Sequence, residues 1–216
     1  MRIHRSRAAI ALGVTAAGVA AAVTLSACAG QPSASQPGTN QPGTNQPSTN
    51  QPSPAEFAWF HARPALDGWH RISLPDGQAV LSYPQSLHAL ASDQGTVSEG
   101  LTTNSGTALV YLNVTPRQGD ETLRDWPEFR LDHLLEDDAS AARMTGQATG
   151  LKFRGGLGSC VLDAYTTKVH ANYFREIACF VQGARGSSVL VAATPAGDWG
   201  TYAGLLEQAV TSYAVS

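Results

Sequence analysis

Residue types that could carry catalysis are present in the sequence, but their spacing does not assemble them. Gly156-Leu157-Gly158-Ser159 approaches the G-x-S-x-G motif of serine hydrolases and lacks the second glycine. No other serine is placed by the sequence beside a histidine and an acid. The glycine run from Gly155 to Gly158 also lacks the lysine and the following helix of a phosphate-binding loop. The sequence therefore predicts no catalytic residue and indicates that the protein is not an enzyme.

Potential metal ligands are equally scattered. His133 and Asp137, four residues apart in an acidic segment, could share one face of a helix. One such pair is short of the ligands that a metal site needs, and an acidic helix face is usually just solvated. The remaining histidines beyond residue 28 are isolated from one another: His61, His70, His88 and His170. We predict no bound metal ion and no cofactor.

Cys28 has a much clearer chemical context. It follows Leu25-Ser26-Ala27, an aliphatic residue and two small ones. Upstream, a basic stretch at residues 2–7 precedes about eighteen mostly apolar residues, Ala8 to Leu25. This charged-then-apolar order is typical of a secretory signal. The apolar length is borderline for a membrane-spanning helix, so length alone leaves a permanent transmembrane anchor open.

Leu25-Ser26-Ala27-Cys28 resembles the lipobox of bacterial lipoproteins. The resemblance implies cleavage between Ala27 and Cys28 and a diacylglyceryl thioether on the Cys28 thiol. The alternatives are an ordinary small-residue cleavage site, or an uncleaved anchor with a chance cysteine. We expect residues 1–27 to be a lipoprotein signal peptide. The lipid would hold the protein in the cell membrane, on its extracytoplasmic face.

Residues 28–56 predict a linker that does not fold. From Gln31 to Pro54 the five-residue repeat QPSAS-QPGTN-QPGTN-QPSTN-QPSP contains no charge and no large apolar side chain. Such a segment cannot bury enough surface to offset its ordering entropy. Fully extended it would reach about 70–75 Å at roughly 3.1 Å per residue. It is either a spacer that lifts a domain off the membrane or a neutral low-complexity insertion.

Residues 57–216 are enough for one domain with a proper core. Of the 14 Lys and Arg residues, Arg2, Arg5 and Arg7 lie in the signal, which leaves 11 against 17 acids and a formal net charge near −6. A chain this acidic lacks the clustered basic residues that nucleic acid requires. It also offers no polybasic attraction to anionic lipid, so an acyl group must do the anchoring.

With Cys28 lipidated, Cys160 and Cys179 remain as an even pair. In an exported domain such a pair usually forms a disulfide, which would stabilise by roughly 3 kcal/mol on the chain-entropy model. Two free buried thiols or a redox pair are the alternatives, although the CxxC spacing typical of redox chemistry is absent.

Turn signals divide the domain into hairpins. Strands over 69–74 and 79–83 flank Pro75-Asp76-Gly77, and strands over 96–103 and 107–114 flank Asn104-Ser105-Gly106. In the second half we predict strands over 143–153, 160–169, 173–181 and 187–193, with a turn at Gly155 to Gly158.

Two helices are predicted. The first runs from Trp126 to Asp137, with Asp125 as its N-cap and an apolar stripe of Phe129, Leu131, Leu134 and Leu135. The second begins after Asp198 and carries apolar residues at helical spacing up to Val210. Because hairpin connections dominate, we expect an α+β domain in which an antiparallel β-sheet is flanked by two or three helices.

Scattered residues resemble actinobacterial lipoproteins with a PsbP-like α/β domain, the LpqN-like lipoproteins. They are an early tryptophan, a strand closing on Tyr83-Pro84, the strand Tyr173-Phe174-Arg175-Glu176-Ile177 with its cysteine, and a closing pattern from Trp199 to Tyr213. The resemblance implies a PsbP-like α/β/α sandwich. It also implies a binding or assembly module without a shared catalytic motif.

Three functions remain open on the sequence. The first is a non-catalytic binding or accessory module of the cell envelope, with an envelope protein or a small molecule as its partner. The second is a lipid or small-molecule carrier. The third, which the missing catalytic motifs disfavour, is a cell-wall hydrolase.

Overall fold

The structure is a computed structural model in which residues 54–216 are described. The predicted signal peptide, Cys28 and the linker as far as residue 53 lie outside the described residues. The first element, η1 (Pro54–Phe57), is a 3-10 turn that includes the last residues of segment 28–56. Phe57 and Phe60, within and just after this turn, are buried in the core.

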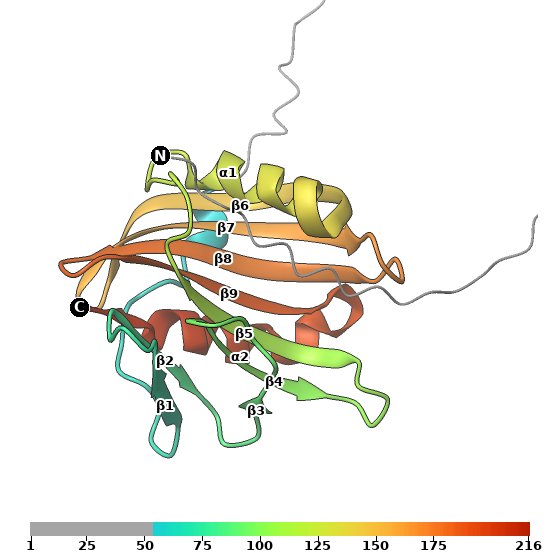
Figure 1. Ribbon diagram of the computed structural model, residues 1–216, viewed down its shortest axis with the longest axis horizontal. Helices are drawn as coiled ribbons and strands as arrows, with labels where there is room; N and C mark the ends of the chain where they lie inside the picture. The colour runs from blue at the N-terminus through green and yellow to red at the C-terminus, as the bar shows by residue number, and fades with distance from the viewer. Residues whose placement is uncertain (1–53) are drawn as a thin grey trace, which may run out of the picture. The chain divides into compact units, whose positions relative to one another are not determined.

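A seven-stranded antiparallel sheet forms the centre of the domain, with the strand order β3-β4-β5-β9-β8-β7-β6 (Figure 1). Its strands are β3 (His88–Ala89), β4 (Val97–Thr102), β5 (Ala108–Pro116), β6 (Ala139–Phe153), β7 (Gly156–Thr167), β8 (Tyr173–Gly183) and β9 (Ser187–Pro195). Most neighbours in the sheet are also neighbours in the chain, so hairpins account for most of the pairing.

A second, smaller sheet has the order β1-β2-β10, with strands β1 (His70–Ser73), β2 (Ala79–Tyr83) and β10 (Ala214–Val215). The β1–β2 turn lies at the predicted Pro75-Asp76-Gly77, where Asp76 Oδ1 accepts a hydrogen bond from the Gln78 amide at 2.8 Å. In the same sheet, the C-terminal strand β10 pairs antiparallel with β2.

Helices cover both faces of the main sheet. Helix α1 (Trp126–His133) packs on β6, β7 and β8 on one face, and α2 (Trp199–Ser212) packs on the other (Figure 1). Buried apolar side chains form two separate clusters, one on each face. The predicted α+β fold, an antiparallel sheet flanked by helices, is confirmed.

Strand β8 shows how one sequence supplies both layers. Ile177, Cys179 and Val181 join the cluster beneath α2, whereas Ala178 and Phe180 join the cluster beneath α1. Successive side chains of a strand point to opposite faces, so a strand covered on both sides reads as a continuous apolar run.

The predicted turn at Gly155 to Gly158 is present but shorter than predicted, because Gly156 to Gly158 belong to β7. Strand β6 ends at Phe153 and β7 begins at Gly156, so only Arg154 and Gly155 connect them. A Cβ at Gly155 would collide with the backbone oxygen of Val215, and one at Gly158 would collide with the Phe153 ring. At both positions a neighbouring group lies too close to the backbone for a side chain, so glycine is needed. In the sequence alone, the same glycines look like a turn signal.

The first helix begins at Trp126 as predicted, but its end and its buried face differ. It ends at His133, and a π-helical turn, η2 (Leu134–Asp138), follows. The Asp125 side chain does not cap the helix, because it accepts hydrogen bonds from the backbone and hydroxyl of Thr122 instead. Leu135, expected in the apolar stripe, is 43% exposed.

The second helix matches its prediction from Trp199 onward. Leu206, Ala209 and Val210 are buried against the sheet. Tyr213 follows directly, and its hydroxyl forms a 2.6 Å hydrogen bond with Ser188 Oγ. The C-terminal segment is thus held to β9 by apolar packing and one buried polar contact.

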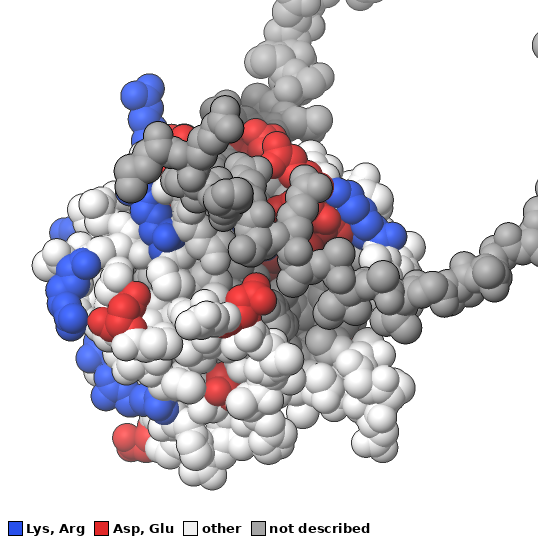
Figure 2. Space-filling model, viewed as in Figure 1, with Lys and Arg blue, Asp and Glu red and all other residues white. Residues whose placement is uncertain are grey.

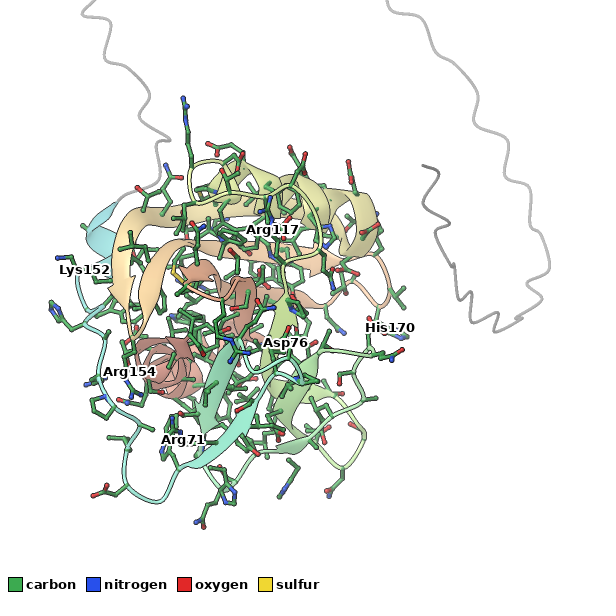
Figure 3. The ribbon with its side chains drawn as sticks, turned by 60° about the vertical axis from the view of Figure 1, so that its left-hand side comes forward. Arg71, Asp76, Arg117, Lys152, Arg154 and His170 are labelled. Atoms are coloured by element: carbon green, nitrogen blue, oxygen red, sulfur yellow. A yellow bond between two sulfur atoms is a disulfide. The ribbon has the colours of Figure 1, made fainter. Side chains whose placement is uncertain are left out.

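The predicted disulfide between Cys160 and Cys179 is present. The two residues are directly opposite in the β7–β8 register, with their Cα atoms 4.1 Å apart, and both are fully buried. Figure 3 shows it as a yellow bond inside the domain. Burial inside the core favours a structural role over a redox role, because a reductant has no direct access.

Removing this disulfide is expected to weaken the domain without changing its fold. The double substitution Cys160→Ala and Cys179→Ala should lower the free energy of unfolding by about 3 kcal/mol, from the entropy that the cross-link removes from the unfolded chain. Denaturant titration with and without a reductant measures this. The reductant should destabilise the wild type alone, and an equal effect on the double variant would contradict the prediction.

Candidate functional site

The residues predicted from sequence fall into two groups. Ala27 and Cys28, the predicted cleavage and lipidation positions, lie outside the described residues and stay predictions. Cys160 and Cys179 form the disulfide. Any candidate site within residues 54–216 must therefore be built from residues other than these four.

The histidines do not assemble into a metal site in the described part of the chain. His133 Nδ1 lies 3.5 Å from Asp137 Oδ2, and both side chains are largely solvated. His170 projects from the tip of the β7–β8 hairpin, away from the body of the domain (Figure 3). Among residues 54–216, no group of three or more His, Cys, Asp and Glu residues could hold a metal ion.

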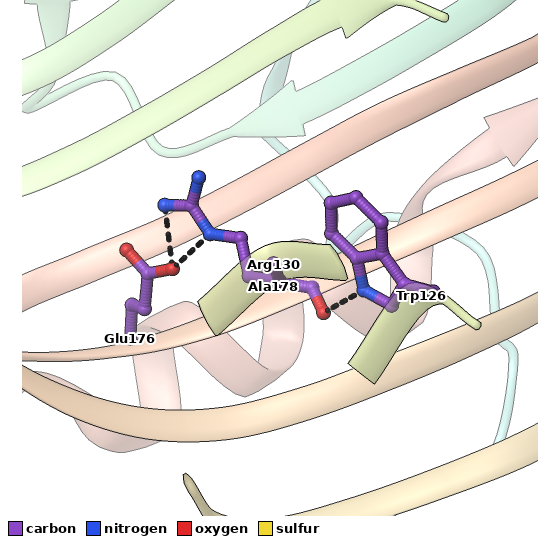
Figure 4. A network of polar contacts seen from close by, with 4 residues as sticks. All are labelled: Trp126, Arg130, Glu176 and Ala178. Carbon is purple, nitrogen blue, oxygen red and sulfur yellow. Dashed lines mark hydrogen bonds and ion pairs between the residues drawn. The ribbon is translucent and has the colours of Figure 1, made fainter. Parts of the chain in front are cut away.

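Two clusters of buried acids do stand out. The first, which we call the α1 ionic cluster, consists of Arg130 from α1, Asp163 from β7 and Glu176 from β8. Arg130 Nε and one terminal nitrogen each lie 2.7 Å from Glu176 Oε1 (Figure 4). The Arg130 side chain is almost fully covered, so this is a buried ion pair between the helix and the sheet.

The position of Arg130 follows from the helix itself. Trp126, Arg130 and Leu134 recur at four-residue spacing, and Trp126 and Leu134 are both buried against the sheet. The Trp126 indole Nε1 donates a 3.0 Å hydrogen bond to the Ala178 carbonyl oxygen, which positions the start of α1 over β8 (Figure 4). One turn later, Arg130 reaches Glu176 on the same strand.

Asp163 is directly opposite Glu176 in the β7–β8 register, and both are 0% exposed. Burial, and then the charge of Glu176, raise the pKa of Asp163 well above its ordinary value, although Arg130 acts in the opposite sense. Burial on its own would lower the pKa of Arg130, but the neighbouring Glu176 and Asp163 raise it, so the guanidinium stays charged. Burial also raises the pKa of Tyr165, beside the cluster.

The second cluster lies where the small sheet meets the main one. We call it the seam cluster: Glu99 of β4, Tyr83 of β2, His70 of β1 and His88 of β3. The Tyr83 hydroxyl and the Glu99 carboxylate lie close enough for each to shift the pKa of the other. The His70 ring stacks on that of Tyr83 with centroids 5.8 Å apart. Glu99 is 2% exposed, but the two histidines are open to solvent, so the cluster lies near the edge of the domain.

Burial raises the pKa of Glu99, while the Tyr83 hydroxyl and the two histidines pull it down. These groups offer a ligand one acid, one phenol and two imidazoles. None of them is a nucleophile activated by a base. The seam cluster therefore favours polar contact with a ligand or between the two sheets over covalent chemistry.

Sequence reasoning missed both clusters, although a signal was available. Glu99 is in phase with Val97 and Leu101 on the core side of β4, and Asp163 and Glu176 interrupt apolar strands. An acid at a core-facing position must be paired or protonated, because an isolated buried charge is very costly. Its partner could not be named without the strand register.

Comparison with known proteins gives structural likeness only. No protein-family model matches the sequence, and no curated protein matches it. The chain is similar to cyanobacterial PsbP (CyanoP) from Synechocystis sp. PCC 6803, at 14% identity and a TM-score of 0.49, over 70% of this chain and 95% of that one.

Two further solved structures are similar. LpqN of Mycobacterium tuberculosis, described as involved in cell envelope biogenesis, has 11% identity and a TM-score of 0.45, over 68% of this chain and 90% of that one. PA94 of Pseudomonas aeruginosa, a protein of unknown function, has 12% identity and a TM-score of 0.45, over 67% and 94%. Likeness at this level does not establish a common function. Within residues 54–216, no helix is long and apolar enough to cross a membrane.

Breaking the Arg130–Glu176 pair from one side should be costly. Arg130→Met leaves Glu176 buried without its counter-charge, so we expect a loss of about 3–5 kcal/mol in the free energy of unfolding. The double variant Arg130→Met, Glu176→Gln should lose less than the sum of the two single changes. Urea titration of the four proteins measures this coupling.

Asp137→Asn is the matched control, because it breaks the exposed pair with His133 on the same segment. It should change stability by no more than about 1 kcal/mol. Additive losses in the Arg130 and Glu176 variants would show that the buried pair is not a coupled unit.

Proposed function

We propose that the protein is a bacterial lipoprotein, anchored through lipid on Cys28 at the extracytoplasmic face of the cell membrane. Its domain would act as a non-catalytic binding or accessory module of the cell envelope. The observation that carries the proposal is Leu25-Ser26-Ala27-Cys28 at the end of a basic and then apolar N-terminal stretch. The resemblance of the domain's residue pattern to actinobacterial lipoproteins with a PsbP-like domain agrees with this role.

The anchor is physically sufficient by itself. Each buried CH₂ contributes about 0.8 kcal/mol, and a single acyl chain binds a membrane only marginally. Two or three chains on Cys28 would hold the protein essentially permanently. The segment from Gln31 to Pro54 would then separate the domain from the bilayer.

Surface charge supports anchoring by lipid alone. Acidic side chains gather over α1 and the turn that follows it (Figure 2). The exposed acids of this region include Glu128, Asp132, Glu136, Asp137 and Asp138. An anionic membrane would repel this part of the surface.

The buried acids support a non-catalytic domain. Four acids are buried in the described residues, and three of them have a polar partner in the fold, whereas the Asp163 oxygens have no hydrogen-bond donor. Glu99 lies beside the Tyr83 hydroxyl, Glu121 accepts hydrogen bonds from the backbone N–H groups of Gln118 and Gly119, and Asp163 and Glu176 belong to the α1 ionic cluster. This use of the acids leaves none of them beside a serine nucleophile as its general base.

Cys28→Ala should abolish lipidation and release the protein from membranes, because only the thiol can carry the thioether. In bacteria that express the full chain, the wild type should partition into the detergent phase, and the variant should stay in the aqueous phase. Mass spectrometry of the mature N-terminus should find lipid on Cys28. Ser33→Ala, just beyond the motif, is the control and should behave as wild type. A wild-type protein that retains residues 1–27 would refute the proposed anchor.

The binding role predicts a recurrent partner at the envelope. Crosslinking the full chain in intact cells should yield the same partner repeatedly, and Cys28→Ala, which displaces the domain from the membrane, should reduce its yield. The absence of any recurrent partner, together with measurable turnover of an envelope substrate, would refute a non-catalytic binding role while leaving the anchor intact.

A further inference from the structure

The α1 ionic cluster contains more acceptors than donors. Both oxygens of Asp163 and Oε2 of Glu176 are buried without a hydrogen-bond donor. Asp163 and Glu176 are directly opposite each other in the β7–β8 register, and both are fully buried. A hydrogen bond between two carboxyl oxygens exists only when one of them carries a proton. A favourable contact between Asp163 and Glu176 therefore requires that one of the two carboxyl groups is protonated.

The charge balance leads to the same requirement. Three elements supply charged groups here: Arg130 from α1, Asp163 from β7 and Glu176 from β8. Two ionised carboxylates beside one guanidinium would leave a net negative charge in the interior, whereas one shared proton makes the cluster neutral. Tyr165 on β7 is the other titratable neighbour, with Asp138 of the turn after α1 beyond it, and neither supplies positive charge.

The neighbouring strands supply no second cation. Met144 of β6 is opposite Asp163, and Ala193 of β9 is opposite Glu176. Glu176 Oε1 already accepts both contacts from Arg130, so Glu176 is the ionised member. Asp163, which has no donor of its own, is the member that needs the proton.

We propose that Asp163 and Glu176 share one proton, resident on Asp163, and that this proton makes the attachment of α1 to the sheet sensitive to pH. With the proton in place, Glu176 is free to pair with Arg130 and hold the helix. Without it, Asp163 and Glu176 repel each other and compete for one guanidinium. The device is thus a proton-dependent latch between α1 and strands β7 and β8.

The direction of the pH effect follows from the raised pKa of Asp163. An acid whose pKa is higher in the folded state stabilises the fold fully below its ordinary pKa, 3.8 for this group. That contribution is lost as the pH rises through the folded value. Between pH 3.8 and the pKa of Asp163 in the folded protein, the ratio of folded to unfolded protein should fall by up to about tenfold per pH unit.

Asp163→Asn tests the proposal in the full chain. The asparagine amide can donate to Glu176 as the protonated acid does, but it cannot lose a proton. From pH 5 to pH 8, the variant should gain stability relative to wild type, by up to about tenfold per pH unit in the folding equilibrium. Asp132→Asn, an exposed acid of α1, is the control and should show no such divergence. Parallel stability curves for wild type and Asp163→Asn would overturn the proposal.

Two measurements on the wild type keep the proposal testable if the variant fails to fold. Carbon-13 NMR of the carboxyl groups should show Asp163 protonated at neutral pH, and an ionised Asp163 at pH 7 would overturn it. Hydrogen exchange, corrected for the intrinsic effect of pH, should show α1 losing protection as the pH rises while α2 keeps it. Equal behaviour of the two helices would overturn the latch.

Discussion

The register of β7 against β8 is the constraint on which the rest of the domain depends. The disulfide joins Cys160 to Cys179, which are directly opposite in the two strands. Three residues away in each strand, Asp163 is opposite Glu176. Because side chains alternate between the faces of a sheet, an odd step of three moves from the α2 face to the α1 face. One covalent bond on one face thus fixes the pairing of two acids on the other.

The two helices attach to that sheet by different physics. Helix α2 is fourteen residues long and buries Leu206, Ala209 and Val210, so the hydrophobic effect holds it. Helix α1 has eight residues and buries Trp126 in the apolar cluster on its face, and it is also positioned by the Trp126 hydrogen bond and the Arg130 ion pair. The Arg130–Glu176 pair depends on charge state, whereas apolar packing and the neutral Trp126 hydrogen bond do not.

This difference bears on how a tethered binding module could work. At the proposed extracytoplasmic location the domain would experience changes of pH that the cytoplasm buffers, and α1 is attached partly through the ionisable groups of Arg130 and Glu176. The exposed side of α1 also carries much of the acidic surface of the domain (Figure 2). The same helix thus combines a charged outer face with a charge-dependent attachment. The rigid, disulfide-linked sheet and α2 would provide the scaffold beneath it.

The sequence by itself determined the fold class, the hairpins, the second helix and the disulfide, because these depend on local patterns: alternation in strands, turn residues, helical spacing and an even pair of cysteines. It also carries the whole basis for the predicted lipid anchor at Cys28. Only the tertiary structure decided which face of α1 is buried and which acids meet. In the sequence, Arg130 has the pattern of a solvent-exposed helix residue, and Asp163 and Glu176 look like isolated acids in apolar strands. The fold brings Arg130 to Glu176, 46 residues away, and the strand register places Asp163 opposite Glu176, 13 residues away. Such pairings depend on the three-dimensional path of the chain, and no local pattern encodes them.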